Sequence, residues 1–296
     1  MDHATDIQNR YGIVGRTDEL RLALAVLGAG GHLLLEGSVG VGKTTVALAV
    51  CRHLGRATVR VDGDERYTEN KLTGWFDPPL VLKSGYGEAS FFPGPLVSAM
   101  RQGAVLFINE LNRMPESVQN VLLPALDERL LILPRIGEVR AADGFQVVAT
   151  QNPVEYIATG HLSEALKDRF EHIALRHQSE EEEREIVRRV TRSSDEALVR
   201  VAVAIVRQTR CHPRLRKGAS VRAATAVVLL TGQLDGKSAG QPGVLEYPDV
   251  LDSPSLRRAA LTALATRVEL RDEEGVDPSD GLSAVVDEII EIVKKN

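Results

Sequence analysis

Gly37-Ser38-Val39-Gly40-Val41-Gly42-Lys43-Thr44 is the stretch that decides the fold, because it fits the phosphate-binding pattern G-x-x-x-x-G-K-[ST]. The apolar run Leu33-Leu34-Leu35 before it predicts a buried strand, and Thr45 to Leu54 predicts a helix that ends at Gly55. The motif requires a strand, a loop and a helix in this order. The sequence therefore favours a nucleotide-binding loop over a glycine-rich turn without a ligand.

The residues of this loop predict how it would hold a nucleotide. Glycines allow successive backbone N–H groups to converge on one phosphate, and the N-terminus of the following helix adds partial positive charge. We expect Lys43 to bridge the β- and γ-phosphates of ATP, and the Thr44 hydroxyl to ligate Mg²⁺. The expected nucleotide contacts are Gly37, Ser38, Val39, Gly40, Val41, Gly42, Lys43, Thr44 and Thr45.

Length and composition limit the other possibilities. The 296 residues, 43% of them hydrophobic, suffice for two domains with a sizeable core. No apolar run is long enough to span a membrane, and the polar start of the chain is not expected to be a signal peptide. Only Cys51 and Cys211 are present, so we expect no disulfide framework and a reducing, cytoplasmic location. The seven histidines show no ligand spacing, and the net charge of −5 disfavours a nucleic-acid partner.

Strand and helix patterns alternate as far as Leu175, and the rest of the chain is predicted to be helical. This order favours an α/β fold in residues 1–176, with a parallel sheet sandwiched by helices, and a smaller all-α domain in residues 177–296. The predicted strands are Leu33–Leu35, Thr58–Val61, Val105–Ile108, Gln146–Thr150 and His172–Leu175.

Helical spacing of apolar residues predicts a helix from Pro115 to Arg129, and Leu130–Arg140 resembles a hairpin. Ser179-x-x-Glu182 is a capping box that starts a charged helix. The least certain segment is the polar loop Gln233–Asp249. The later predicted helices are Asp195–Arg207, Val221–Gln233, Ser255–Arg267 and Ser279–Lys294.

A second chemical element is the apolar run from Ala104 to Ile108, which ends in Asn109 and Glu110. In a phosphate-loop ATPase the first polar residue after such a strand helps to hold Mg²⁺ and is usually Asp. The second is an acid that can activate water, and Glu110 fits as this general base. Asn109 can still accept a hydrogen bond from a metal-bound water, but it carries no charge, so we expect weaker metal binding and turnover. The alternative is a strand that runs into a polar turn.

Four more segments complete a pattern when they are taken in chain order: Phe92-Pro93-Gly94-Pro95-Leu96, Asn109-Glu110-Leu111-Asn112-Arg113, Ala149-Thr150-Gln151-Asn152-Pro153 and Lys167-Asp168-Arg169-Phe170. With them the chain resembles a MoxR-type AAA+ ATPase, in the wider group that includes the magnesium chelatase motor subunit. The resemblance extends from Val14-Gly15-Arg16 to Gly218-Ala219-Ser220-Val221-Arg222-Ala223. It implies a P-loop AAA+ core followed by a helical lid.

The resemblance also implies roles for three further residues. Asn152 matches the sensor that contacts the γ-phosphate or positions water, although an Asn-Pro pair alone indicates a turn. Arg169 matches the arginine finger that reaches the nucleotide of a neighbouring subunit, and the alternative is a solvated Asp-Arg pair. Arg222 matches the sensor of the lid, and the alternative is an ordinary surface arginine.

Two insertions are implied to face a ring pore or a bound partner. One includes Leu72–Phe76 with the only tryptophan, Trp75, and the other is the hairpin Leu130–Arg140. The alternative for the aromatic residues is packing in the core or between subunits.

The function implied by the resemblance is an ATP-driven remodelling motor or chaperone that assists assembly, cofactor insertion or activation of a partner protein. Such proteins are expected to form homo-oligomeric rings, with six subunits favoured, and to act through an adaptor such as a von Willebrand A domain. Two alternatives stay open. One is a nucleic-acid motor, for which the candidate basic and aromatic residues are sparse. The other is a nucleotide-gated scaffold with weak hydrolysis, which Asn109 keeps open.

Overall fold

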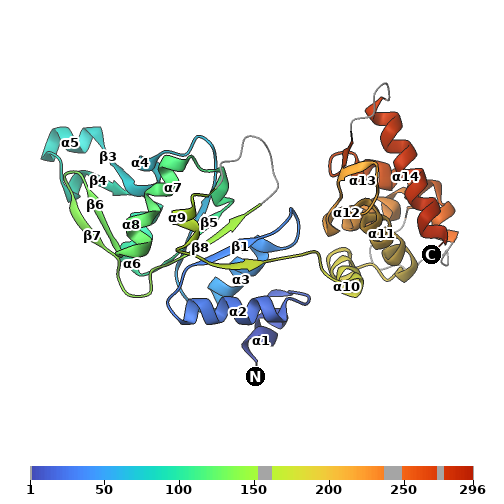
Figure 1. The fold of residues 1–296 in the computed structure, drawn as a ribbon, viewed down its shortest axis with the longest axis horizontal. Helices are drawn as coiled ribbons and strands as arrows, with labels where there is room; N and C mark the ends of the chain where they lie inside the picture. Colours follow the sequence, from blue (N-terminus) through green and yellow to red (C-terminus); the bar gives the residue numbers. More distant parts are fainter. Residues whose placement is uncertain (1, 153–161, 237–248, 272–276, 296) are drawn as a thin grey trace. The chain divides into compact units, whose positions relative to one another are not determined.

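The computed structural model describes residues 2–152, 162–236, 249–271 and 277–295 (Figure 1). Within it the chain divides into two units, Met1–Arg176 and His177–Asn296. None of the helices described is both long and apolar enough to cross a membrane.

A five-stranded sheet forms the centre of the first unit. Its strands, in spatial order, are β2 (Thr58–Asp62), β5 (Val105–Asn109), β8 (Gln146–Gln151), β1 (Leu33–Glu36) and β9 (Glu171–Ala174). All neighbouring strands are parallel, so the predicted parallel sheet is confirmed. Because parallel strands end at the same edge, the segments that follow β1, β2, β5 and β8 meet there.

Helices cover both faces of this sheet, as expected for the α/β sandwich. One face packs against α1 (His3–Tyr11), α2 (Thr17–Gly28) and α3 (Lys43–His53). The other packs against α4 (Glu69–Thr73), α6 (Pro95–Gln102), α7 (Glu116–Asn120) and α8 (Leu122–Asp127). Alternate residues of the strands supply the two cores: Leu33, Leu35 and Phe107 on the first face, and Leu34, Leu106 and Ile108 on the second.

The helix predicted over Pro115–Arg129 is divided into α7 and α8 at Val121. Pro124 has no N–H to donate to the carbonyl of Asn120, the last residue of α7, so the hydrogen bond that would continue the helix is missing there. The hairpin that follows is present as β6 (Leu130–Leu133) and β7 (Gly137–Arg140).

The first insertion forms a short antiparallel ladder of β3 (Gly74–Phe76) and β4 (Phe91–Pro93), with α5 (Pro78–Ser84) and a 3-10 turn (Glu88–Ser90) between them. The rings of Trp75 and Phe92 stack with centroids 6.1 Å apart. Trp75 is 51% exposed and Phe92 is 44% exposed, so core packing is wrong for this pair.

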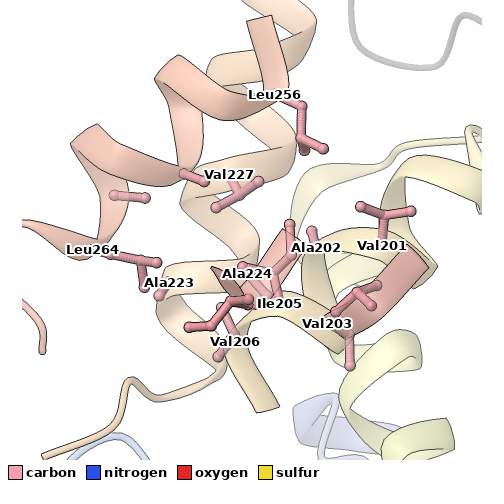
Figure 2. Packing of buried hydrophobic residues seen from close by; sticks show 14 of the residues in the cluster. Val201, Ala202, Val203, Ile205, Val206, Ala223, Ala224, Val227, Leu256 and Leu264 are labelled. Atoms are coloured by element: carbon pink, nitrogen blue, oxygen red, sulfur yellow. The ribbon is translucent and has the colours of Figure 1, made fainter. Parts of the chain in front are cut away.

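The second unit contains α10 (Glu180–Thr191), α11 (Glu196–Thr209), α12 (Val221–Leu234), α13 (Pro254–Leu264) and α14 (Pro278–Lys295). Figure 2 shows buried side chains of α11 (Ile205, Val206), α12 (Val227) and α13 (Leu256, Leu264) in one hydrophobic cluster. The unit also holds a 3-10 turn (Asp249–Asp252) and a short antiparallel ladder of β10 (Leu215–Lys217) and β11 (Glu269–Leu270), which the all-helical prediction did not include. Most of the predicted loop Gln233–Asp249 lies outside the described residues.

An ion-pair cluster around the buried carboxylate of Glu183 joins α10 to the end of α11. The predicted capping box is present, and Glu183 in the first turn of α10 is only 2% exposed. Its carboxylate lies 3.1 Å from Nη1 of Arg207 and 2.8 Å from Nη1 of Arg210. The carboxylate is buried, whereas the side chains of Arg207 and Arg210 are 36% and 14% exposed, so water screens the two arginine charges in part.

We expect Glu183→Gln to destabilise the second unit by about 2 kcal/mol, because the change keeps the shape of the side chain but removes the charge that accepts hydrogen bonds from two arginines. Urea unfolding followed by far-UV circular dichroism measures this effect. The exposed Glu181→Gln is the matched control, for which a change below about 0.5 kcal/mol is expected. Equal midpoints for the two variants would contradict a structural role for the cluster.

Candidate nucleotide-binding site

The predicted phosphate loop lies between β1 and α3, as the motif requires. Gly40 and Gly42 have φ values of 80° and 95°, which favour glycine. A Cβ at Gly37 would lie 2.3 Å from the carbonyl oxygen of Leu175, so a larger residue does not fit there either. Gly42 caps α3, which places the N-terminus of that helix at the loop.

Lys43 and Asn152, predicted from separate motifs, meet at this loop. The Lys43 ammonium is buried and donates to the carbonyl oxygens of Gly37, at 2.6 Å, and Ser38, at 2.9 Å. It also donates to Oδ1 of Asn152, which lies directly after β8. The Asn112 amide holds Asn152 in turn, donating to its backbone oxygen at 3.2 Å. The loop, the lysine and the predicted sensor therefore form one arrangement.

Oxygen-bearing side chains gather beside Thr44. The Thr44 hydroxyl donates to Oδ1 of Asn109 at 2.9 Å, and the Thr150 hydroxyl donates to the same oxygen at 3.1 Å. On its other side, the Asn109 amide nitrogen donates to Oδ1 of Asp62 at 3.0 Å. Threonine hydroxyl, amide and carboxylate oxygens are the ligand types that Mg²⁺ prefers.

Asp62 was missed by the sequence analysis. It ends β2, and it is the register partner of Asn109 on β5. Arg60 donates to its carboxylate from Nη2 at 2.8 Å and from Nε at 3.2 Å. These bonds, with a smaller contribution from Asn109, lower the pKa of Asp62. The sequence does show an acidic residue, Asp62, directly after a predicted strand. Its contact with Asn109 depends on β2 lying next to β5, which the sequence alone does not reveal.

Glu110 follows Asn109 in a left-handed conformation with φ of 59°. Such a conformation is rare outside glycine and is concentrated at functional sites. The Glu110 N–H donates to the Thr150 hydroxyl at 2.9 Å, and its carboxylate is paired with Nη1 of Arg113 at 2.9 Å. The turn therefore places the predicted base directly after β5, with its carboxylate held by Arg113.

The phosphate loop, Thr44 and Asn109 have the chemistry needed to bind a nucleotide together with Mg²⁺. Within the described ranges, no group of three or more His, Cys, Asp or Glu side chains forms a self-sufficient metal site. Magnesium at nucleotide sites uses few protein ligands and completes its shell with phosphate oxygens and water. Thr44 and Asn109, the two predicted metal ligands, are in contact and match this requirement.

A cavity of about 500 Å³ lies beside the loop and was not predicted. The end of α1 and the outer face of α3 form its walls. Thr44 lines this cavity and also contacts Asn109, the other predicted magnesium ligand. The lining residues are Arg10, Tyr11, Gly12, Thr44, Thr45, Leu48, Ala49 and Arg52.

Arg169 lies in the turn between α9 (Glu164–Lys167) and β9. Its Nε donates to Asp127 at 2.8 Å and lowers the pKa of that carboxyl, and its Nη1 donates to the Ala165 carbonyl at 3.0 Å. Neither partner belongs to the phosphate loop. Arg222 is exposed in the first turn of α12, in the second unit. The roles of both arginines stay predictions.

Residues 32–170 match the family described as AAA domain (dynein-related subfamily). The gas vesicle ATPase GvpN of Haloferax mediterranei is 30% identical over 270 residues, covering 83% of this chain and 73% of GvpN. Protein MoxR of Methylorubrum extorquens is 34% identical over 161 residues, which is 53% of this chain but only 44% of MoxR. The RuvB Holliday junction branch migration motor of Thermotoga maritima shares the fold, with a TM-score of 0.54 and 19% identity over 89% of this chain and 72% of RuvB.

Proposed function

The chain belongs to the MoxR-type AAA+ ATPases, and we propose that it hydrolyses ATP to remodel a partner protein or complex. One observation carries this proposal. At the carboxyl edge of the sheet Lys43 contacts Asn152, Thr44 contacts Asn109, and Glu110 directly follows Asn109. They are the groups that hydrolysis of a bound nucleotide needs.

The site residues divide the chemistry among them. The loop N–H groups and Lys43 hold the phosphates, which requires the ammonium to exchange the Gly37 and Ser38 carbonyls for phosphate oxygens. Magnesium, when bound, neutralises charge on the β- and γ-phosphates. Glu110 accepts a proton from the attacking water, and Asn152 orients that water or the γ-phosphate. The base and ribose occupy the cavity beside Tyr11 and Thr45.

We also propose that the catalytic unit is a ring, with six subunits favoured. Arg169 is then supplied to the nucleotide of the next protomer, and a finger supplied in this way requires a head-to-tail interface. Arg222 acts as the sensor by which the helical unit responds to the phosphates. The side chain of Arg169 is 31% exposed and, among the described residues, pairs with Asp127 and Asp168 of the same protomer, which supports an intermolecular role.

The output of the motor is proposed to be assembly, activation or cofactor insertion of a client in the cytoplasm, through an adaptor such as a von Willebrand A domain protein. The free cysteines Cys51 and Cys211 support a reducing location. The exposed Trp75–Phe92 pair and the β6–β7 hairpin are the proposed working surfaces. Co-purification from the native host with a variant that binds but does not hydrolyse ATP tests this output.

Lys43→Ala is expected to weaken Mg-ATP binding by about 100-fold or more, because charge-assisted hydrogen bonds to the phosphates are lost. Calorimetric titration with Mg-ATP measures the loss. Lys83→Ala removes the same charge from the exposed end of α5 and serves as the control. Unchanged affinity in folded Lys43→Ala protein would refute the phosphate-loop assignment.

A further inference from the structure

Building on the proposed magnesium–nucleotide site, we propose that Asp62 is a positioning residue that supplies the negative charge absent from Asn109. Asp62 lies on the neighbouring strand, where its carboxylate accepts a hydrogen bond from the Asn109 amide nitrogen and so orients the amide. The acidic function usually found on one strand is thereby divided between β5 and β2.

The sheet register places the two side chains together. Asp62 and Asn109 are paired residues at the carboxyl ends of β2 and β5, and their side chains are joined by the 3.0 Å hydrogen bond. The backbone secures this register, because the Gly63 N–H donates to the Asn109 carbonyl at 2.7 Å. A Cβ at Gly63 would lie 2.1 Å from the Glu110 carbonyl oxygen, so glycine is needed for this approach.

Asp62 decides which way the Asn109 amide points. A carboxylate can only accept hydrogen bonds, so the amide nitrogen must face Asp62. The hydroxyls of Thr44 and Thr150 on the opposite side can donate or accept, so they do not select an orientation by themselves. With the nitrogen held by Asp62, the amide oxygen is directed toward Thr44, where the metal is expected.

The charge of Asp62 also acts at this position. Groups that hydrogen-bond to a metal-binding oxygen or its carrier orient it and adjust metal affinity. Arg60 opposes this effect in part, since it is paired with the same carboxylate. The competing explanation is that Asp62 only forms a solvated pair with Arg60 and that its contact with Asn109 has no consequence.

Equilibrium titration distinguishes these explanations without relying on turnover. All variants carry Glu110→Gln to suppress hydrolysis, and each is titrated with Mg²⁺ while binding of a fluorescent N-methylanthraniloyl ATP is recorded. We expect Asp62→Asn to raise the half-saturating Mg²⁺ concentration about 10-fold or more, as for other outer-shell changes. Nucleotide binding in EDTA should stay unchanged, which confirms that the loop is intact.

The exchanged variant Asp62→Asn/Asn109→Asp returns the charge to β5 and is expected to recover most of the lost magnesium affinity. Asp64→Asn, which removes a nearby carboxylate paired with Arg66, is the matched control and should behave like the parent. An unchanged Mg²⁺ requirement in Asp62→Asn would overturn the proposal. So would a loss that the exchange leaves unrepaired, because Asp62 would then act only on the fold. If the parent itself shows no Mg²⁺-dependent binding, the proposed function fails instead.

Discussion

Glu110→Gln is expected to slow ATP hydrolysis by about 10²–10⁴-fold while leaving Mg-ATP binding intact. Glutamine preserves the size of the side chain and can still accept from Arg113 through its amide oxygen, but it carries no charge and cannot take a proton from the attacking water. The Glu110 backbone is fixed by its N–H bond to Thr150 and by the left-handed turn, so the substitution should not displace Asn109. Single-turnover hydrolysis measures the chemical step, and calorimetry measures binding.

The control for this prediction is Glu116→Gln, which removes an exposed carboxylate from the first turn of α7. The turnover of Glu116→Gln should match that of the parent, because Glu116 is not one of the proposed nucleotide-site residues. Wild-type hydrolysis in Glu110→Gln would remove Glu110 from the mechanism. A parallel loss of ATP binding would instead show that Glu110 and its Arg113 partner hold the nucleotide site together.

The fold and the phosphate site were largely predictable because their signals are local. Apolar runs such as Val105–Ile108 marked the buried strands, and the glycine pattern from Gly37 to Gly42 specified the loop. The strand order explains what was missed. Asp62 becomes meaningful only because β2 lies next to β5, so that a residue 47 positions away in sequence reaches Asn109.

Other differences have the same long-range origin. The ladder between β10 and β11 joins short segments, Leu215–Lys217 and Glu269–Leu270, that lack the alternating pattern of a predictable strand. The cavity beside the loop depends on α1, whose Tyr11 carries no motif of its own. The proposed roles of Arg169 and Arg222 depend on a second molecule or on the relation of the two units, so local sequence patterns cannot predict them.

Arg169→Ala protomers are expected to bind ATP normally but to lose about 10³-fold or more in hydrolysis rate, as when other arginine fingers are removed. The guanidinium of Arg169 is bound to Asp127 at its own surface, away from the loop residues. For catalysis it must exchange Asp127 for the phosphates of a neighbouring protomer. Lys167→Ala, which removes a nearby positive charge paired with Glu164, is the control and should change the rate little.

Mixing Arg169→Ala with Glu110→Gln protomers separates action between protomers from action within one. In a mixed ring, some interfaces join an intact Glu110 on one protomer to an intact Arg169 on the next, so part of the activity should return. If Arg169 served its own nucleotide, every protomer would lack either its base or its finger, and no ratio would restore hydrolysis. The measurement is ATPase rate against mixing ratio, with light scattering to establish co-assembly. Failure to recover in rings shown to be mixed would mean that Arg169 is a structural or same-chain residue, and that a head-to-tail ring is not the catalytic unit.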